Sequence, residues 1–260
     1  MILDRIVKAK QEEVAFLKQG KPLEQIKDEA LDTPLPRNFG AAVSGTGCSI
    51  IAEIKRRSPS KGRIRDDFDH IDIALCYENH GAAAISVLTD QRFFEGERSY
   101  LSEIKRVVSV PLLRKDFIID SYQVYETRVL GGDALLLIAG LMDLNTLRDF
   151  ISLTESLGLS PLVEVHSAGE MKKALGAGAK IIGINNRNLK TFEADLKISL
   201  DLLSAVPKGR TVISESGIHT RGDIEMLMSN GIHAFLVGET LMGAADIGAK
   251  LDELLGTVNK

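Results

Sequence analysis

Residues 49–62, SIIAEIKRRSPSKG, place an acid and a base at the end of an apolar run. The run is typical of a strand buried on both faces, and Glu53 and Lys55, two residues apart, would point the same way on it. A basic loop rich in turn residues follows, where a strand cannot continue. An acid and a base at the carboxyl end of a strand suit proton-transfer chemistry, although an ordinary surface salt bridge would have the same pattern.

Two more charged residues lie within or beside apolar runs. Lys115 follows Pro-Leu-Leu-Arg, and Glu164 stands in Pro-Leu-Val-Glu-Val-His. A carboxylate there is costly to bury unless it is paired, and burial would push its pKa toward values useful for proton transfer. Structural alternatives remain open: Lys115 could pair with Asp116 or another carboxylate, and Glu164 could belong to an ion pair. We interpret His166 as a loop residue or as a histidine with satisfied hydrogen bonds.

Two turns near the end of the chain have the composition of an anion site. Glu215-Ser216-Gly217 ends one predicted strand, and Gly238-Glu239 ends the next, at the start of a short segment (239–242) that could be helical. Backbone amides at such turns bind phosphate in many barrels, and Lys55 could supply a counter-charge. The alternative is that both glycines only make tight turns.

These residues can form one site only if the fold brings the ends of several strands together. Apolar runs rich in Val, Ile, Leu and Ala alternate with amphipathic segments, and Gly or Pro stands where many of these helices should end. We predict strands at 50–55, 83–89, 111–117, 134–139, 161–166, 180–185, 211–215 and 234–238. We predict helices that include 100–108, 122–130, 144–157, 168–175, 224–229 and 245–255.

Eight such units, at roughly 20 to 35 residues each, indicate an α/β protein with a (β/α)8 TIM barrel. An open doubly wound sheet is the competing fold, but no GxGxxG fingerprint follows any predicted strand. Helical spacing over 2–18, a second short helix opened by Pro22 and a connection over 33–47 precede the barrel. We expect a single domain, 1–260, with an N-terminal helical extension (1–47) and the barrel (48–260).

Composition limits the classes of partner. The net charge is -4, and the basic residues gather locally between Lys55 and Arg65, which suits a small anion better than a nucleic acid. Cys48 and Cys76 have no metal-ligand spacing, and no metal site is expected. The sequence has neither a signal peptide nor a membrane-spanning run, so we expect a cytoplasmic protein with no membrane partner.

The motifs AEIKRRSPSKG, LLRKDFI, LVEVH, IGINNRNL, SESGI and FLVGETLM occur in this order. In this the chain resembles indole-3-glycerol phosphate synthase, the barrel enzyme of tryptophan biosynthesis, over nearly its whole length. The resemblance implies a lyase that converts 1-(2-carboxyphenylamino)-1-deoxyribulose 5-phosphate to indole-3-glycerol phosphate, carbon dioxide and water, without cofactor or metal. We expect a monomer that associates at most weakly with other enzymes of that pathway.

The resemblance also implies roles for individual residues. Lys115 matches the general acid, Glu164 the group that handles the hydroxyl and proton of the dehydration, and Lys55 a lysine that contacts the substrate carboxylate. Glu53 and Asn185 match residues that orient the lysines and sugar hydroxyls. The remaining matches are the substrate-binding positions Ser58, Arg187, Glu215 and Ser216, the apolar walls Phe94 and Phe117 around the anthranilate ring, and the phosphate-binding Gly217, Gly238 and the amide of Glu239. Some members have Ser at position 239.

Three alternatives remain at this stage. Phosphoribosylanthranilate isomerase is another phosphate-binding barrel, but it uses a Cys and an Asp, and no Cys stands beside Glu53 and Lys55. A Schiff-base aldolase would use Lys115 as nucleophile. A barrel that only senses a phosphorylated metabolite would leave Lys115 and Glu164 without a reason to be charged inside an apolar barrel.

Overall fold

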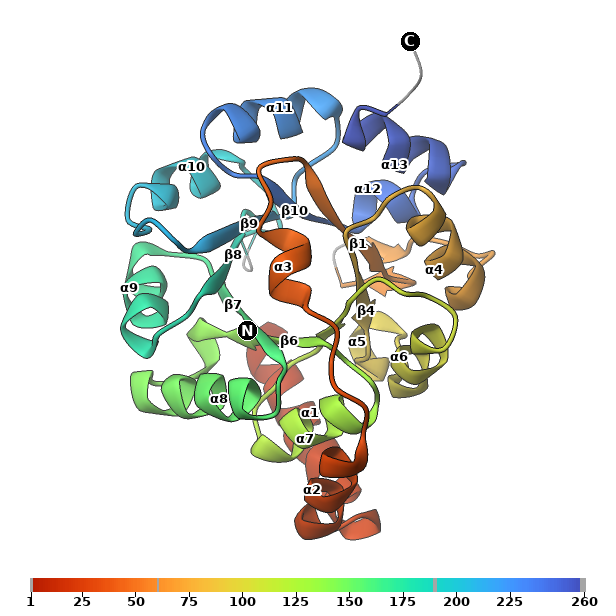
Figure 1. Ribbon diagram of the computed structural model, residues 1–260, viewed down its shortest axis with the longest axis vertical. Helices are drawn as coiled ribbons and strands as arrows, with labels where there is room; N and C mark the ends of the chain where they lie inside the picture. Colours follow the sequence, from red (N-terminus) through yellow and green to blue (C-terminus); the bar gives the residue numbers. More distant parts are fainter. Residues whose placement is uncertain (1, 60, 189–190, 258–260) are drawn as a thin grey trace.

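A closed barrel of parallel strands forms the centre of the computed structural model, which describes residues 2–59, 61–188 and 191–257 (Figure 1). The strands are neighbours in the order β1-β10-β9-β8-β7-β6-β5-β4. Their bounds are β1 Ser49–Ile54, β4 Ala84–Leu88, β5 Leu112–Lys115, β6 Ala134–Ile138, β7 Ser160–Val165, β8 Ile181–Asn185, β9 Thr211–Glu215 and β10 Ala234–Val237. The predicted strands therefore lie within a residue or two of the observed ones, and the TIM barrel is confirmed.

Helices surround the barrel and cover its outer face. They are α4 His70–Asn79, α6 Arg98–Lys105, α7 Ser121–Val129, α8 Leu144–Ser156, α9 Ala168–Ala177, α10 Lys197–Leu203, α11 Arg221–Ser229 and α13 Ile247–Leu255. Side-chain caps fix several starting points, among them capping boxes at Asp120 and Thr220. The predicted glycine ends also hold, since Gly178 and Gly231 have φ values of 94° and 95°, which side chains with a Cβ rarely adopt.

Short elements follow several strands on the side of the barrel where the strands end. The hairpin β2 (Arg57–Ser58) and β3 (Gly62–Arg63) follows β1, and α5 (Gln91–Phe94) follows β4. The turn η1 (Ala139–Leu141) follows β6, and α12 (Glu239–Met242), the segment expected to be helical, follows β10. The basic loop that follows β1 thus contains a hairpin, and its Ser60 lies outside the described residues.

The N-terminal extension consists of α1 Ile2–Gly20, α2 Leu23–Asp32 and α3 Phe39–Val43. The prediction of a simple connection over 33–47 missed α3, a short helix capped by the side chain of Asn38. Phe39 and Val43 are buried in one apolar cluster with inward-facing strand residues such as Ile51. Figure 1 shows α3 across the centre of the strand ring. This helix therefore closes the barrel at the end where the strands begin.

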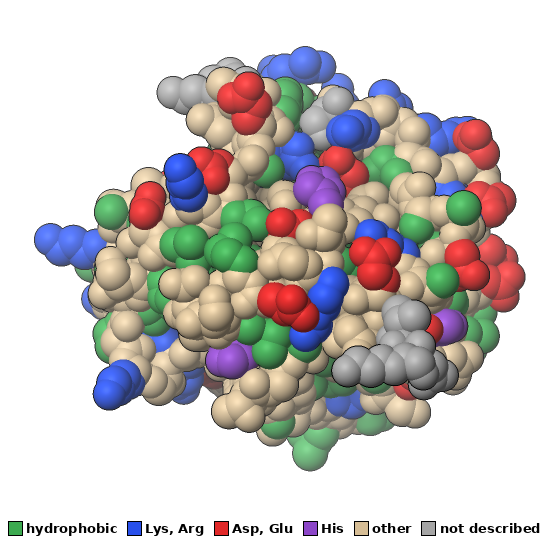
Figure 2. Space-filling view, turned by 90° about the horizontal axis from the view of Figure 1, so that it is seen from above, with side chains coloured by type: hydrophobic (Ala, Val, Ile, Leu, Met, Phe, Trp, Pro, Cys, Tyr) green, Lys and Arg blue, Asp and Glu red, His purple; other side chains and the backbone are tan. Residues whose placement is uncertain are grey.

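The surface shown in Figure 2, seen from the side of α11 and α13, carries Lys and Arg interspersed with Asp and Glu. Acidic and basic side chains lie next to each other there, without a field of one sign. This mixture agrees with a net charge of only -4. None of the helices in the described part of the chain has the length and apolar content needed to span a bilayer.

Candidate active site

A pocket of about 170 Å³ opens where the barrel strands end. Its lining comes from the ends of β1, β5, β7, β8, β9 and β10 and from the loops that follow, because the carboxyl ends of parallel strands converge there. The structure brings together every site residue predicted from the sequence: Glu53, Lys55, Ser58, Phe94, Lys115, Phe117, Glu164, Asn185, Arg187, Glu215, Ser216, Gly217, Gly238 and Glu239.

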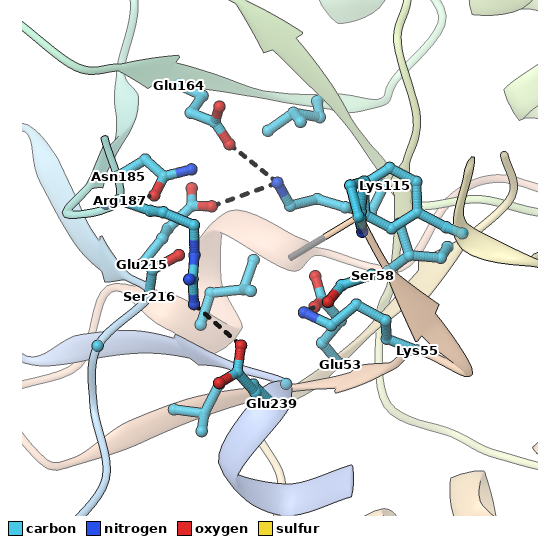
Figure 3. A pocket seen from close by; sticks show the side chains of 18 of the residues that line it. Glu53, Lys55, Ser58, Lys115, Glu164, Asn185, Arg187, Glu215, Ser216 and Glu239 are labelled. Carbon is cyan, nitrogen blue, oxygen red and sulfur yellow. Dashed lines mark hydrogen bonds and ion pairs between the residues drawn. The ribbon is translucent and has the colours of Figure 1, made fainter. Parts of the chain in front are cut away.

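Lys115 lies at the centre of the pocket, at the last residue of β5 (Figure 3). Its Nζ is 2.9 Å from Glu164 Oε2 and 3.4 Å from Glu215 Oε2. Burial lowers the pKa of Lys115, but the charges of Glu164, Glu215 and Glu53 outweigh burial and raise it above the usual value. The side chain is therefore an ammonium. The alternative pairing with Asp116 is not seen, since that carboxylate binds other cations.

Glu164 extends from β7 toward Lys115 and is 3 % exposed. Burial acts to raise the pKa of Glu164, but Lys115 and His166, with a hydrogen bond from Asn185, lower it to about 2. Burial thus acts in the expected direction, but the neighbouring charges outweigh it, and the prediction of a pKa in the proton-transfer range is wrong. His166 Nε2 lies 3.4 Å from Glu164 Oε1 and has no hydrogen-bond partner within the described residues. His166 is the loop residue expected, directly after β7, but its Nε2 is not satisfied by a hydrogen bond to any described residue.

The carboxyl with the raised pKa is Glu215, at the end of β9. Burial raises the pKa of Glu215 most; Lys115 opposes this, Glu164 and Glu53 add to it, and the result is about 8. Gly183 of β8 makes room for this group, because a Cβ there would overlap Glu215 Oε1. Sequence reasoning placed Glu215 only as a lining residue. A glycine inside the apolar run of β8 was the available signal of a close approach.

Glu53 and Lys55 form the predicted pair at the end of the first barrel strand. Lys55 Nζ donates to Glu53 Oε1 at 2.6 Å, and Glu53 is 4 % exposed. Gly238 faces this carboxylate, since a Cβ at that position would overlap Glu53 Oε1. The strand ends at Ile54, one residue before the predicted end. The acid–base pair is thus buried in the pocket, and the alternative of a surface salt bridge is wrong.

The two predicted anion turns lie side by side at the ends of β9 and β10. Ser216 and Gly217 both have left-handed φ values, 68° and 77°. Arg187 Nη2 lies 3.0 Å from Glu239 Oε2 (Figure 3). Lys61 Nζ lies 3.4 Å from Glu239 Oε1. The Glu239 carboxylate is therefore held by two cations.

A buried amide that sequence reasoning did not assign supports the first turn. Asn186 is fully buried, and its Nδ2 donates to Ser214 Oγ at 2.9 Å and to the carbonyl of Ser216 at 3.0 Å. Its Oδ1 accepts from the backbone N–H and the hydroxyl of Ser199 at 3.1 and 2.8 Å. Because Ser216 has a left-handed φ that a residue with a Cβ rarely adopts, Asn186 helps to hold it there.

One wall of the pocket is apolar. The rings of Phe94 and Phe117 are 6.1 Å apart between centroids, and Ile2, Leu3 and Ile6 of α1 also line the pocket. The contribution of α1 was not predicted, although its apolar stripe was. Among the described residues, no group of three or more His, Cys, Asp or Glu is arranged to hold a metal ion.

The loop after β1 carries arginines that share one carboxylate, that of Glu95. Glu95 lies 3.1 Å from Arg57 and 3.2 Å from Arg63, measured between the charged atoms. Glu95 itself has a φ of 52° at the end of α5. These pairs connect the hairpin after β1 to the loop after β4, beside the pocket mouth.

Comparison with known proteins gives one family over almost the whole chain. The family model described as indole-3-glycerol phosphate synthase matches residues 3–254. The chain is 46% identical over 259 residues to the indole-3-glycerol phosphate synthase of Aromatoleum aromaticum, covering 98% of this chain and 99% of that protein. It is 48% identical over 259 residues to the enzyme of the same name from Ruminiclostridium cellulolyticum, covering 99% and 100%.

Solved structures with low sequence identity show the same fold. A 3-hexulose-6-phosphate synthase superposes with a TM-score of 0.63 at 15% identity, covering 81% of this chain and 100% of that one. A mutant tryptophan synthase α-subunit from Pyrococcus furiosus gives a TM-score of 0.61 at 16% identity, covering 80% and 98%. At these identities the likeness concerns the barrel alone.

Proposed function

The chain belongs to the indole-3-glycerol phosphate synthase family, and from that membership we propose how its pocket performs the reaction. The activity is that of a carboxy-lyase in tryptophan biosynthesis. The observation that carries the proposal is the position of Lys115, an ammonium held between the buried carboxyl groups of Glu164 and Glu215 at the centre of the pocket. Phosphoribosylanthranilate isomerase, the alternative considered from sequence, is set aside by this membership.

In the proposed ring closure, the aromatic carbon that bears the carboxylate attacks the carbonyl carbon of the ribulose moiety. Lys115 donates a proton to the carbonyl oxygen as it becomes an alkoxide, and its position in a buried site makes this interaction strong. The carbon–carbon bond to the carboxylate then breaks and releases carbon dioxide. Lys55, 2.6 Å from Glu53, is placed to contact that carboxylate before it leaves.

In the proposed dehydration, the hydroxyl formed in the first step leaves as water and the five-membered ring becomes aromatic. Glu164 handles the proton and hydroxyl of this step, and Asn185 orients Glu164 and the sugar hydroxyls. Lys115 and Glu164 come from different strands, so a donor and an acceptor can act on different parts of the substrate. Separation of the pair by bound substrate would raise the pKa of Glu164 and make it a stronger proton acceptor, since the Lys115 charge is what lowers it.

The two ends of the substrate fit the two sides of the pocket. We assign the phosphate to the turns at Gly217 and Gly238 and to the amide of Glu239, because the Glu239 side chain is already bound to Arg187. We assign the anthranilate ring to the wall formed by Phe94 and Phe117. We assign the sugar to the space between, which Ser58, Arg187 and Ser216 line. Membership of the family implies a phosphorylated small molecule as substrate.

We further propose that the enzyme acts in the cytoplasm as a monomer and associates at most weakly with other tryptophan-pathway enzymes. Sedimentation velocity of the purified protein tests the oligomeric part of this proposal. A single species near 28.3 kDa is the expected result. A stable dimer at micromolar concentration would contradict it.

Fluorescence of the indole product provides the direct test of the reaction, with purified protein and no added metal or cofactor. Glu164→Gln should lower turnover by about two to four orders of magnitude, the range for removing an acid or base group. Glu155→Gln is the matched control, since Glu155 forms an ion pair with Lys180 on the surface of the barrel. Wild-type-like turnover by Glu164→Gln would overturn the role of Glu164. Capture of the substrate by borohydride reduction would favour a Schiff-base enzyme instead.

A further inference from the structure

A lysine of the N-terminal helix is buried next to the pocket. Lys10 of α1 is 1 % exposed, and its Nζ lies 2.9 Å from Asp116 Oδ1, 3.1 Å from Asp90 Oδ2 and 2.8 Å from Glu13 Oε2. Burial lowers the pKa of Lys10, but the three carboxylates raise it above its usual value, so the side chain stays charged. An ammonium is thus held between a helix of the extension and two barrel loops.

Both barrel carboxylates organise the loops that carry the aromatic wall. Asp116 directly follows Lys115, and its Oδ1 also accepts the backbone N–H of Phe117 at 2.8 Å. Asp90 caps the start of α5 by accepting the N–H of Phe93 at 2.8 Å, and α5 ends with Phe94. The loops after β4 and β5, which position the two rings, therefore both form an ion pair with Lys10.

The same lysine also holds α1, whose apolar side chains form the rest of the wall beside Phe94 and Phe117. Ile6, Lys10 and Val14 are the buried residues of α1, spaced four apart on one face of the helix. Ile6 lines the pocket one turn before Lys10, together with Ile2 and Leu3. If α1 slid along its axis or rotated about it, these apolar side chains would move relative to the phenylalanines.

We propose that Lys10 is a positioning residue for the aromatic half of the substrate site, clamping Asp90, Asp116 and α1 so that their apolar side chains hold the ring. The proposal rests on the proposed function, which assigns this wall to the anthranilate ring. Buried ion pairs contribute little net stability, because desolvation offsets their attraction. What this cluster provides is the relative position of α1 and the loops that follow β4 and β5.

A second lysine of the same helix supplies the matched control. Lys18 Nζ lies 2.7 Å from Asp120 Oδ2 and also connects α1 to the loop after β5, but its side chain is 37% exposed and does not line the pocket. Lys10→Met therefore removes two ion pairs between helix and barrel, and Lys18→Met removes one. Only the first removes contacts to Asp90 and Asp116.

The experiment uses two probes that report on the two halves of the site. Inhibition by 2-aminobenzoate measures binding of an aromatic carboxylate, and inhibition by inorganic phosphate measures the phosphate turns. For Lys10→Met we expect the inhibition constant of 2-aminobenzoate to rise by about tenfold, which corresponds to ~1.4 kcal/mol, while that of phosphate stays unchanged. For Lys18→Met we expect neither constant to change.

A second variant keeps the proposal testable if Lys10→Met does not fold. Asp90→Asn keeps an oxygen that can cap α5 but removes the charge that faces Lys10, and it should also weaken 2-aminobenzoate selectively. Equal weakening of both probes, or no effect on 2-aminobenzoate, would overturn the clamp. If 2-aminobenzoate does not compete with substrate on the wild-type enzyme, the assignment of the ring to this wall fails, and the clamp proposal falls with it. Turnover of the wild type tests the reaction separately.

Discussion

Around Lys115, two buried carboxyl groups, Glu164 and Glu215, share one ammonium, and their pKa values separate because of this imbalance. Glu164 lies closest to Lys115, so its pKa is lowered, whereas Glu215 lies farther away and its pKa is raised by burial and by the other carboxylates. Like charges in one site cannot all ionise at once. At neutral pH the pocket therefore contains one neutral carboxyl, Glu215, beside an ionised Glu164.

Stability as a function of pH tests this assignment. The folded-state pKa of Glu215 is about 8, above the unfolded value of 4.5, so between these pH values the folded state binds more protons and the wild type loses stability as the pH rises. Glu215→Gln removes this proton uptake. The Tm of the variant relative to wild type should rise from pH 5 to pH 8 and then level off. A difference that does not change with pH would contradict the raised pKa.

Among the elements, those set by local pattern were predicted well. Apolar runs bounded by Gly and Pro located the barrel strands, because a buried parallel strand needs a continuous apolar sequence. The charged residues at the strand ends could then be expected to lie close together, because the carboxyl ends of the strands in a barrel converge. What depended on distant contacts was missed: α3, the direction of the pKa change at Glu164, and the partners of Lys10. The position of Lys10 on the buried stripe between Ile6 and Val14 was the signal available.

The turn after β9 gives a prediction at this scale. Removing the Asn186 amide in Asn186→Ala takes away the hydrogen bond to the Ser216 carbonyl, so the left-handed turn should relax. We expect KM to rise by about tenfold and inhibition by inorganic phosphate to weaken equally, with a smaller change in kcat, because a lost hydrogen bond in a buried site costs ~1–3 kcal/mol. Ser199→Ala is the control, since it keeps the contact between Asn186 and Ser216. Unchanged phosphate inhibition in Asn186→Ala would contradict this role.

At the scale of the whole molecule, the extension is joined to the barrel along its length. Arg37 donates to the carbonyls of Val110 and Lys105, and Arg128 donates to those of Pro34 and Thr33. Val14 and Ile26 pack with Tyr122 of α7. We therefore propose that residues 1–260 form a single domain in which the helices before β1 and the barrel unfold together.

Thermal unfolding tests this proposal. Far-UV circular dichroism and tyrosine absorbance should give one coincident transition, because Tyr122 reports on the contact with the extension. Arg128→Met should lower the midpoint without splitting the transition, at a cost of about 1–3 kcal/mol for hydrogen bonds from a charged donor. An early transition confined to the helical extension would show two separate units.

The proposed mechanism assigns the proton of the ring closure to one donor, Lys115, and single-turnover kinetics of Lys115→Met tests this directly. The side chain keeps its approximate length and loses its ammonium, so the proton for the developing alkoxide is removed. Substrate should still bind, and indole formation should slow by about two orders of magnitude or more. Turnover close to that of the wild type would contradict the account, because Lys115 would then have no part in the chemistry.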